Sequence, residues 1–128
     1  MLKGAFLVPH PPLIIPEVGG GRQKTIQKTV EAYRKVAEHI GDLKPDVLVI
    51  ATPHGPSYED CFTLQAGGRA SGSFADFGAP QVRMEVRCDG DLAGRISRLA
   101  GREGLPALAS QDDHAALDHG TLIPLYFI

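Results

Sequence analysis

The pattern of apolar and polar positions predicts a chain in which strands alternate with helices. Residues 4–8 form an apolar run that ends at a proline, which is typical of a short buried strand. Between 24 and 40, apolar residues recur at helical spacing and charged residues fill the other faces, so an amphipathic helix that stops at Gly41 is predicted. Residues 47–51 form a second apolar run, typical of a strand buried on both faces. Together these segments predict a βαβ unit with parallel strands and a right-handed crossover.

The middle of the chain is predicted to contain two further strands separated by a loop. Residues 62–66 are a candidate third strand. Segment 67–80 is rich in Gly, Ser and Ala, which favours a mobile loop or a wide turn. Residues 81–88 alternate between apolar and polar side chains, which indicates a half-exposed strand at an edge of the sheet.

The last third is predicted to hold a helix, a strand and the start of another helix. Asp89 or Asp91 is a suitable N-cap for a helix through residues 92–99, because its carboxylate can accept hydrogen bonds from N–H groups of the first turn. Residues 105–109 are a weak fifth strand, and the apolar segment from Thr121 predicts the start of a helix. This order predicts an α/β fold of three layers, with a mostly parallel or mixed sheet and helices on both faces.

The composition is that of a globular protein and argues against several functions. The chain has 128 residues, 43% of them hydrophobic and 22% charged, which suits a single domain over residues 1–128. A formal net charge of −2 gives no basic face for a nucleic acid and no polybasic segment for a membrane surface. The Pro-rich N-terminus matches neither a signal peptide nor a membrane span, so a cytoplasmic location is expected. Cys61 and Cys88 lack metal-ligand spacing and are expected to be buried, reduced thiols.

Three histidines that follow predicted strands are the strongest chemical pattern in the chain. His10 and His54 each come just after an apolar run, and His119 follows the weak fifth strand. Because ligands of open α/β sheets bind at the carboxyl ends of parallel strands, the imidazoles of His10 and His54 are expected to converge. Two neutral imidazoles with open positions beside them suit Fe(II), Zn or Mn, and a carboxylate would complete a facial triad. The alternative is that each histidine only forms a turn or caps an element.

The remaining polar candidates are less specific. His119, between Asp118 and Gly120, is either a general acid/base or the entry of a helix that Asp118 favours through the helix dipole. His39 is expected on a solvated helix face, and His114 shows no supporting pattern. Three glycines at 19–21 precede a helix, but they lack a phosphate-binding pattern and favour a flexible turn. Several carboxylates are possible ligands, but their spacing favours none of them over the others. They are Glu17, Glu59, Asp60, Asp112 and Asp113.

Three motifs in order along the chain carry a family resemblance. They are Leu7-Val-Pro-His10-Pro-Pro, Thr52-Pro-His54-Gly-Pro and Leu117-Asp-His119-Gly-Thr-Leu-Ile-Pro-Leu125. Together they resemble the superfamily of class III extradiol ring-cleavage dioxygenases (LigB-like), and most closely its Memo-like branch, the AmmeMemoRadiSam system protein B type. The resemblance implies an α/β fold and a non-haem Fe(II) site in which His10 and His54 bind the metal, with Zn or another divalent metal as the alternative. It also implies that His119 is catalytic, that Asp118, His119 and Gly120 line the substrate pocket, and that the substrates are a catechol-type aromatic diol and O₂.

The resemblance further implies that the chain holds the N-terminal half of a LigB/Memo-like domain. In that family the third metal ligand, a glutamate, lies in a C-terminal half, so the chain is expected to be truncated within the fold and incomplete as an isolated dioxygenase. The apolar end, residues 121–128, fits an element that continues or a surface that meets a partner. The hypotheses are therefore a ring-cleaving dioxygenase, a non-catalytic Memo-like metal-binding or partner-binding protein, and a structural fragment. The expected partner is a homo-oligomer or a complementing C-terminal segment, with no nucleic acid and no membrane.

Overall fold

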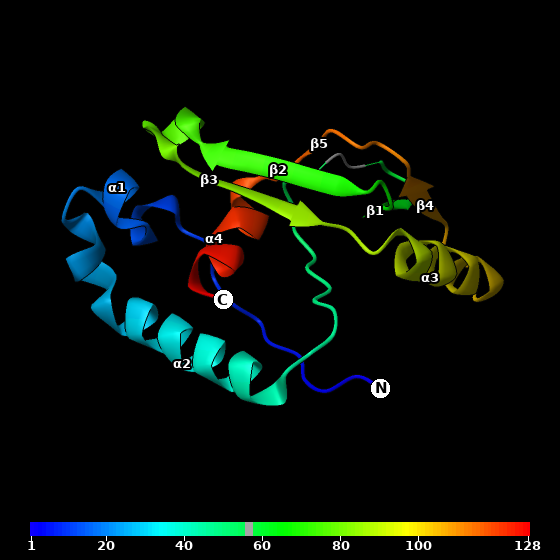
Figure 1. Ribbon diagram of the computed structural model, residues 1–128, viewed down its shortest axis with the longest axis horizontal. Helices are drawn as coiled ribbons and strands as arrows, with labels where there is room; N and C mark the ends of the chain where they lie inside the picture. Colours follow the sequence, from blue (N-terminus) through cyan, green and yellow to red (C-terminus); the bar gives the residue numbers. More distant parts are fainter. Residues whose placement is uncertain (56–57) are drawn as a thin grey trace. The chain divides into compact units, whose positions relative to one another are not determined.

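The computed structural model describes residues 1–55 and 58–128 and shows an α/β fold (Figure 1). The elements in chain order are η1 (Pro12–Ile14), α1 (Pro16–Gly19), η2 (Arg22–Ile26), α2 (Gln27–Leu43), β1 (Phe62–Gln65), β2 (Arg69–Phe74), η3 (Ala75–Phe77), β3 (Ala79–Arg87), α3 (Gly90–Arg102), β4 (Ala107–Ser110), β5 (Ala115–Ala116) and α4 (His119–Phe127). The predicted class, helices with mixed sheets, is confirmed. Pro56, the last residue of the second histidine motif, lies outside the described residues.

The chain forms two compact units. The first unit consists of Met1–Thr52, Ser73–Val82 and His119–Ile128. The second unit consists of Pro53–Gly72 and Arg83–Asp118. The expectation of a single domain over the whole chain stays a prediction.

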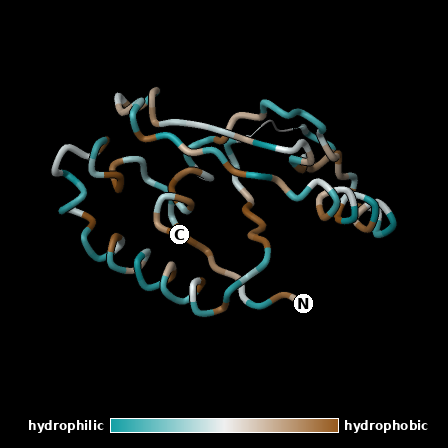
Figure 2. Tube along the Cα trace, in the orientation of Figure 1, coloured by the Kyte–Doolittle hydropathy of each residue, from teal (hydrophilic) through white to brown (hydrophobic). Residues whose placement is uncertain are grey.

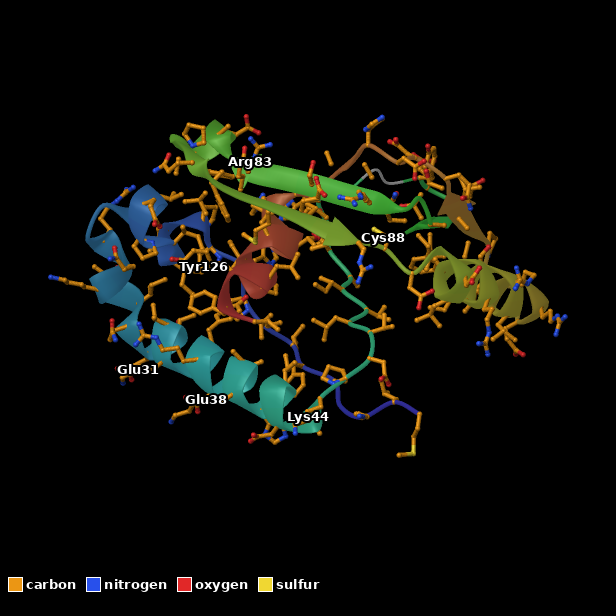
Figure 3. All side chains as sticks on the ribbon, in the orientation of Figure 1. Glu31, Glu38, Lys44, Arg83, Cys88 and Tyr126 are labelled. Atoms are coloured by element: carbon orange, nitrogen blue, oxygen red, sulfur yellow. The ribbon has the colours of Figure 1, made fainter. Side chains whose placement is uncertain are left out.

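Helices α2 and α4 form the centre of the first unit. The Tyr33 ring of α2 stacks on the Phe127 ring of α4, with centroids 4.6 Å apart and planes inclined by 25°. On the other face of α2, Glu31 and Glu38 point away from α4 into solvent (Figure 3). Buried apolar side chains of the two helices are Val30, Tyr33, Ile40, Leu122 and Ile123. The apolar face predicted from helical spacing is therefore the face that packs.

The bounds of α2 differ from those predicted. The helix begins at Gln27, after the 3-10 turn η2, and continues past Gly41 to Leu43. Its C-cap is Lys44, which has a left-handed φ of 44° and donates its N–H to the Gly41 carbonyl. Lys44 precedes Pro45, and a residue before proline is disfavoured in the right-handed helical region. The stop is therefore set by the proline rather than by the glycine.

The Pro-rich segment after the first histidine folds into the short helices η1 and α1. Ile14 and Ile15 are buried, so part of this segment packs against the rest of the unit. A Cβ at Gly19 would lie 2.4 Å from the Leu13 carbonyl oxygen, and Gly20 has a φ of 56°. The glycine run thus forms a turn, as the sequence favoured, and also permits a close approach that was not predicted.

Segments 4–8 and 47–51 contain no strand, so the predicted βαβ unit is wrong. Figure 2 shows apolar stretches in both segments, yet Leu7 is 102% exposed and Val49 is 70% exposed. A strand buried on both faces requires neighbouring strands and covering helices. The apolar composition predicts that these residues favour burial, but it does not provide the neighbours that would bury them.

The second unit contains the parallel pair β1 and β4, covered by α3 (Figure 1). Their register runs from Phe62 opposite Ala107 to Gln65 opposite Ser110, which confirms both predicted strands to within two residues. Asp89 is the N-cap of α3, because its Oδ1 accepts a hydrogen bond from the Leu92 N–H at 2.9 Å. Asp91 lies in the first turn instead.

The second sheet has the strand order β3-β2-β5, and β2 runs parallel to β5. The loop predicted over 67–80 is wrong, because this segment holds β2, η3 and the start of β3. Phe74 and Ala79 are fully buried. Gly72 of β2 permits the close approach of Leu117, which directly follows β5. Strand β3 lies at the edge with alternate residues half-buried and exposed, as predicted. The short strand β5 was not predicted.

The sequence predicted two buried, reduced cysteines and no membrane span. Cys61 and Cys88 are free thiols and half-buried, and burial raises the pKa of Cys88. Among the described helices, none has the length and apolar character that crossing a membrane requires.

Candidate metal centre

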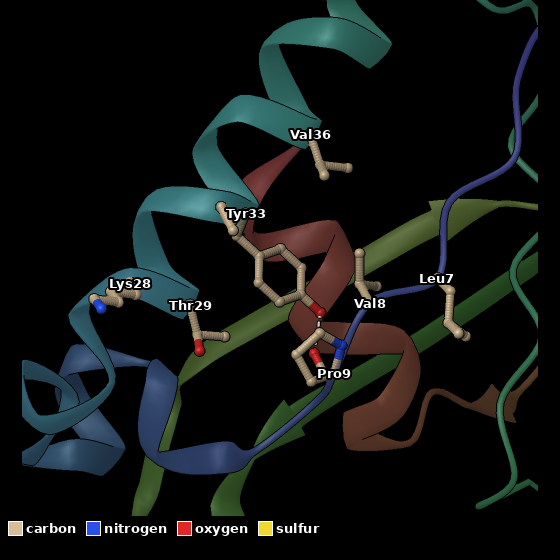
Figure 4. A pocket seen from close by; sticks show the side chains of 8 residues that line it. Leu7, Val8, Pro9, Lys28, Thr29, Tyr33 and Val36 are labelled. Carbon is tan, nitrogen blue, oxygen red and sulfur yellow. Dashed lines mark hydrogen bonds between the residues drawn. The ribbon is translucent and has the colours of Figure 1, made fainter.

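His10 occupies an irregular segment of the first unit, and its side chain is half-buried. Pro9 and Pro11 flank it, and their fixed φ angles restrict the backbone on both sides. The carbonyl of Pro9 accepts a hydrogen bond from the Tyr33 hydroxyl of α2 (Figure 4). The backbone that carries His10 is therefore held by its own prolines and by a neighbouring helix.

His119 is the first residue of α4, and its ring lies beside that of His10. The two ring centroids are 5.7 Å apart, with planes inclined by 54°. A metal–nitrogen bond to imidazole is about 2.0–2.1 Å long, so rings at this separation can approach one common ion. The first and third histidine motifs, which lie near opposite ends of the sequence, thus meet in the first unit.

Phe77 of η3 adds a third ring to this cluster. Its ring meets that of His119 edge to face, with centroids 5.2 Å apart. Phe77 is 39% exposed, whereas Phe74 behind it is fully buried at a centroid distance of 6.2 Å. Phe77 therefore forms a partly exposed apolar wall beside His119. The sequence did not single it out, because it lies in the segment predicted as a loop.

His54 belongs to the second unit, and its side chain is exposed. The expectation that it converges with His10 stays a prediction. Within the first unit, His10 and His119 each offer one ring nitrogen as a possible ligand atom for a metal ion. Imidazole donors suit Fe(II) and Zn, whereas Mg²⁺ and Ca²⁺ prefer oxygen ligands. The chemistry of this donor set therefore fits a divalent transition metal.

The residues beside His119 differ in burial. Gly120 is buried and Asp118 is half-buried, so both neighbours of His119 are shielded from solvent to different degrees. Their predicted contact with substrate stays a prediction. His39 is exposed on α2 and meets the Phe6 ring edge to face at 5.7 Å, which confirms a solvated position.

Two of the candidate carboxylates have structural partners within the second unit. Asp112 accepts a hydrogen bond from the His114 N–H at 2.8 Å, and Asp113 accepts one from the Gly68 N–H at 2.5 Å. These bonds shape the loop between β4 and β5. Neither contact supports a role for these carboxylates, or for the exposed His114, as metal ligands.

A shallow cavity of about 280 Å³ lies where segment 7–9 passes α2 (Figure 4). Its lining is mainly apolar, with Lys28 and Thr29 at one side and Tyr33 at another. The sequence predicted Tyr33 only as a member of the apolar face of α2. Nothing in the sequence could reveal that its hydroxyl bonds to the carbonyl of Pro9, because that partner is distant along the chain.

Comparison with known proteins agrees with the motifs. The model of the family described as "Catalytic LigB subunit of aromatic ring-opening dioxygenase" matches residues 4–128. Protein CA_C1420 of Clostridium acetobutylicum is 39% identical over 134 aligned positions, which cover 99% of this chain and 29% of that relative. The chain therefore spans less than a third of the length of this relative.

Proposed function

Because this chain belongs to the family of the catalytic LigB subunit of aromatic ring-opening dioxygenases, we propose that it contributes the metal-binding histidines of an extradiol-type dioxygenase. The proposed reaction is Fe(II)-dependent cleavage of a catechol-type aromatic diol by O₂. The observation that carries the proposal is the pairing of His10 and His119, whose ring centroids are 5.7 Å apart in the first unit. The Memo-like branch of the family remains the notable alternative.

We assign separate roles to the three histidines. His10 and His54 would hold the metal through neutral ring nitrogens. A bound divalent ion would supply positive charge that stabilises a deprotonated diol. His119 would accept or return the diol proton, since imidazole is a general acid and base and its ring lies beside the metal ligand His10. Phe77 would give the aromatic ring of the substrate an apolar surface next to that proton acceptor.

A second candidate function is metal binding without ring cleavage. The candidate metal donors that the described residues offer are all histidines. Sites of non-haem Fe(II) oxygenases typically use two histidines and one carboxylate, whereas three histidines are also a common set for Zn. This donor set favours a Memo-like protein that keeps the metal site but not the oxidative chemistry.

Anaerobic reconstitution with Fe(II), followed by oxygen-electrode assays with a panel of catechols, tests the proposal. The native chain is expected to bind about one Fe(II), and together with the complementing C-terminal segment it is expected to consume O₂ only when a catechol is present. His10→Ala is expected to weaken metal binding at least about tenfold, because it removes one of the few strong ligands. His39→Ala is the matched control, since His39 is exposed on α2.

The outcomes separate the two functions. Metal binding that depends on His10 but gives no oxygen consumption with any catechol would favour the non-catalytic alternative. If His10→Ala and His39→Ala bound Fe(II) and Zn as tightly as the native protein does, both candidate functions would be contradicted.

A further inference from the structure

Tyr33 is a buried tyrosine whose two ends contact both histidine-bearing segments of the first unit. It lies on α2 with 3% of its surface exposed. Its ring stacks on Phe127, the last residue of α4, and its hydroxyl donates to the Pro9 carbonyl. Helix α4 begins at His119, and Pro9 directly precedes His10. One side chain therefore connects the elements that carry the two paired histidines.

The hydrogen bond acts on the peptide group that precedes His10. The Pro9 carbonyl belongs to the planar unit that ends at the Cα of His10, so fixing this oxygen fixes the direction in which the His10 residue begins. Segment 4–8 is not held in a sheet. The Tyr33 hydroxyl is thus an anchor for backbone that no strand pairing supports among the described residues.

The environment keeps this hydroxyl a donor. Burial raises the pKa of Tyr33 to about 12, so the phenol, which is protonated at neutral pH in any case, also stays protonated in the alkaline range. The ring position is also defined, because the stacked contact with Phe127 restricts its rotation. The donor and the aromatic ring are therefore both fixed in place.

We propose that Tyr33 is a positioning residue for the metal centre, in which its hydroxyl holds the Pro9 carbonyl and thereby sets the His10 imidazole beside His119. The proposal rests on the proposed function for its effect on metal binding, but its geometric part concerns the metal-free chain. Tyr33 itself contacts neither the metal nor the substrate in this role.

The test compares Tyr33→Phe, which keeps the stacked ring and removes the hydroxyl, with the native chain. In the metal-free protein, the imidazole ¹⁵N and ¹H signals of His10 are expected to shift and broaden in Tyr33→Phe, while those of His39 stay unchanged. Binding of Co(II), followed by its visible absorption, is expected to weaken about two- to tenfold, the cost of one lost hydrogen bond. Tyr126→Phe, which removes a hydroxyl from an exposed position of α4, is expected to match the native protein.

Each outcome bears on the proposal. Unchanged His10 signals in a folded Tyr33→Phe protein would overturn it, whether or not metal binds. If the native chain binds no Co(II) but the His10 signals shift in Tyr33→Phe, the proposed metal function fails and the positioning role stands. If Tyr33→Phe does not fold, 3-fluorotyrosine at position 33 replaces it, since a more acidic hydroxyl must shift the Pro9 carbonyl ¹³C signal. The absence of that shift would equally overturn the proposal.

Discussion

At the scale of single residues, Gly72 of β2 occupies a position that requires the absence of a side chain. A Cβ at this residue would lie 2.4 Å from the carbonyl oxygen of Leu117 and 3.0 Å from its Cβ. The Leu117 N–H in turn donates to the Ser71 carbonyl at 2.9 Å. The glycine thus permits the close approach of β2 to the segment that leads to His119.

We therefore expect Gly72→Ala to lower the free energy of unfolding by about 1–3 kcal/mol, because backbone atoms must move to admit the methyl group. Urea unfolding followed by circular dichroism measures the change. Gly101→Ala is the matched control. Apart from its chain neighbours and the backbone of its own helix α3, no atom lies within 4 Å of a Cβ built at Gly101, so alanine there should stabilise the helix by about 0.5–1 kcal/mol. Equal stabilities of the two variants would contradict the steric explanation.

At the scale of elements, the start of α3 is set by a residue that the sequence identified as a candidate N-cap. Asp89 accepts the Leu92 N–H, and Ser97 in the same helix donates its hydroxyl to the Ala107 carbonyl of β4 at 2.5 Å. The cap fixes where the helix begins, and the serine links the helix to the strand beside it. Both contacts lie within the second unit.

Replacing Asp89 with alanine is expected to destabilise the chain by about 1 kcal/mol, the usual cost of a lost N-cap. The midpoint of urea unfolding should fall accordingly without a change in its slope. Asp89→Asn keeps an oxygen acceptor and is expected to remain within about 0.5 kcal/mol of the native protein. A loss in Asp89→Asn as large as that in Asp89→Ala would show that charge, rather than the capping hydrogen bond, matters at this position.

The elements that the sequence predicted correctly are those defined by local rules. Strand β3 alternates at period two, α2 has an apolar face, and the cap of α3 is encoded by one carboxylate. The strands predicted at 4–8 and 47–51 are wrong, because an apolar run predicts burial, whereas a strand also needs a neighbouring strand to pair with. Strand β2 was missed because its small residues resemble a loop, and its pairing depends on close approach at Gly72.

The residues of the candidate site also divide into those that the sequence identified and those that it missed. The sequence identified His10 and His119, since each stands in a short motif that follows a predicted strand. It did not identify Phe77 or the Tyr33 hydroxyl, because their contacts with His119 and with Pro9 join distant segments. The convergence of His54 with this pair stays a prediction.

At the scale of the whole molecule, large apolar side chains remain exposed in both units. In the first unit Leu7 and Val49 are 102% and 70% exposed, and in the second Phe62 and Leu99 are 68% and 56% exposed. Contiguous exposed apolar residues typically mark surfaces that bind another protein. Segments 4–8 and 47–51 contain continuous runs of such residues, so we propose that these segments associate with a second copy of the chain.

If these runs mediate self-association, the chain should sediment as a dimer or larger species at micromolar concentration. Leu7→Lys/Val49→Lys should shift it toward the monomer, because charges buried in an interface without partners are costly. Leu99→Lys is the matched control, since this leucine is exposed on α3 but stands outside both runs. Sedimentation velocity with circular dichroism on each variant separates a change in association from a loss of fold. A native chain that is monomeric at all concentrations would exclude self-association and leave a complementing polypeptide as the partner to seek. Equal dissociation of the double variant and the Leu99→Lys control would instead show that exposed apolar area in general, rather than these two segments, drives assembly.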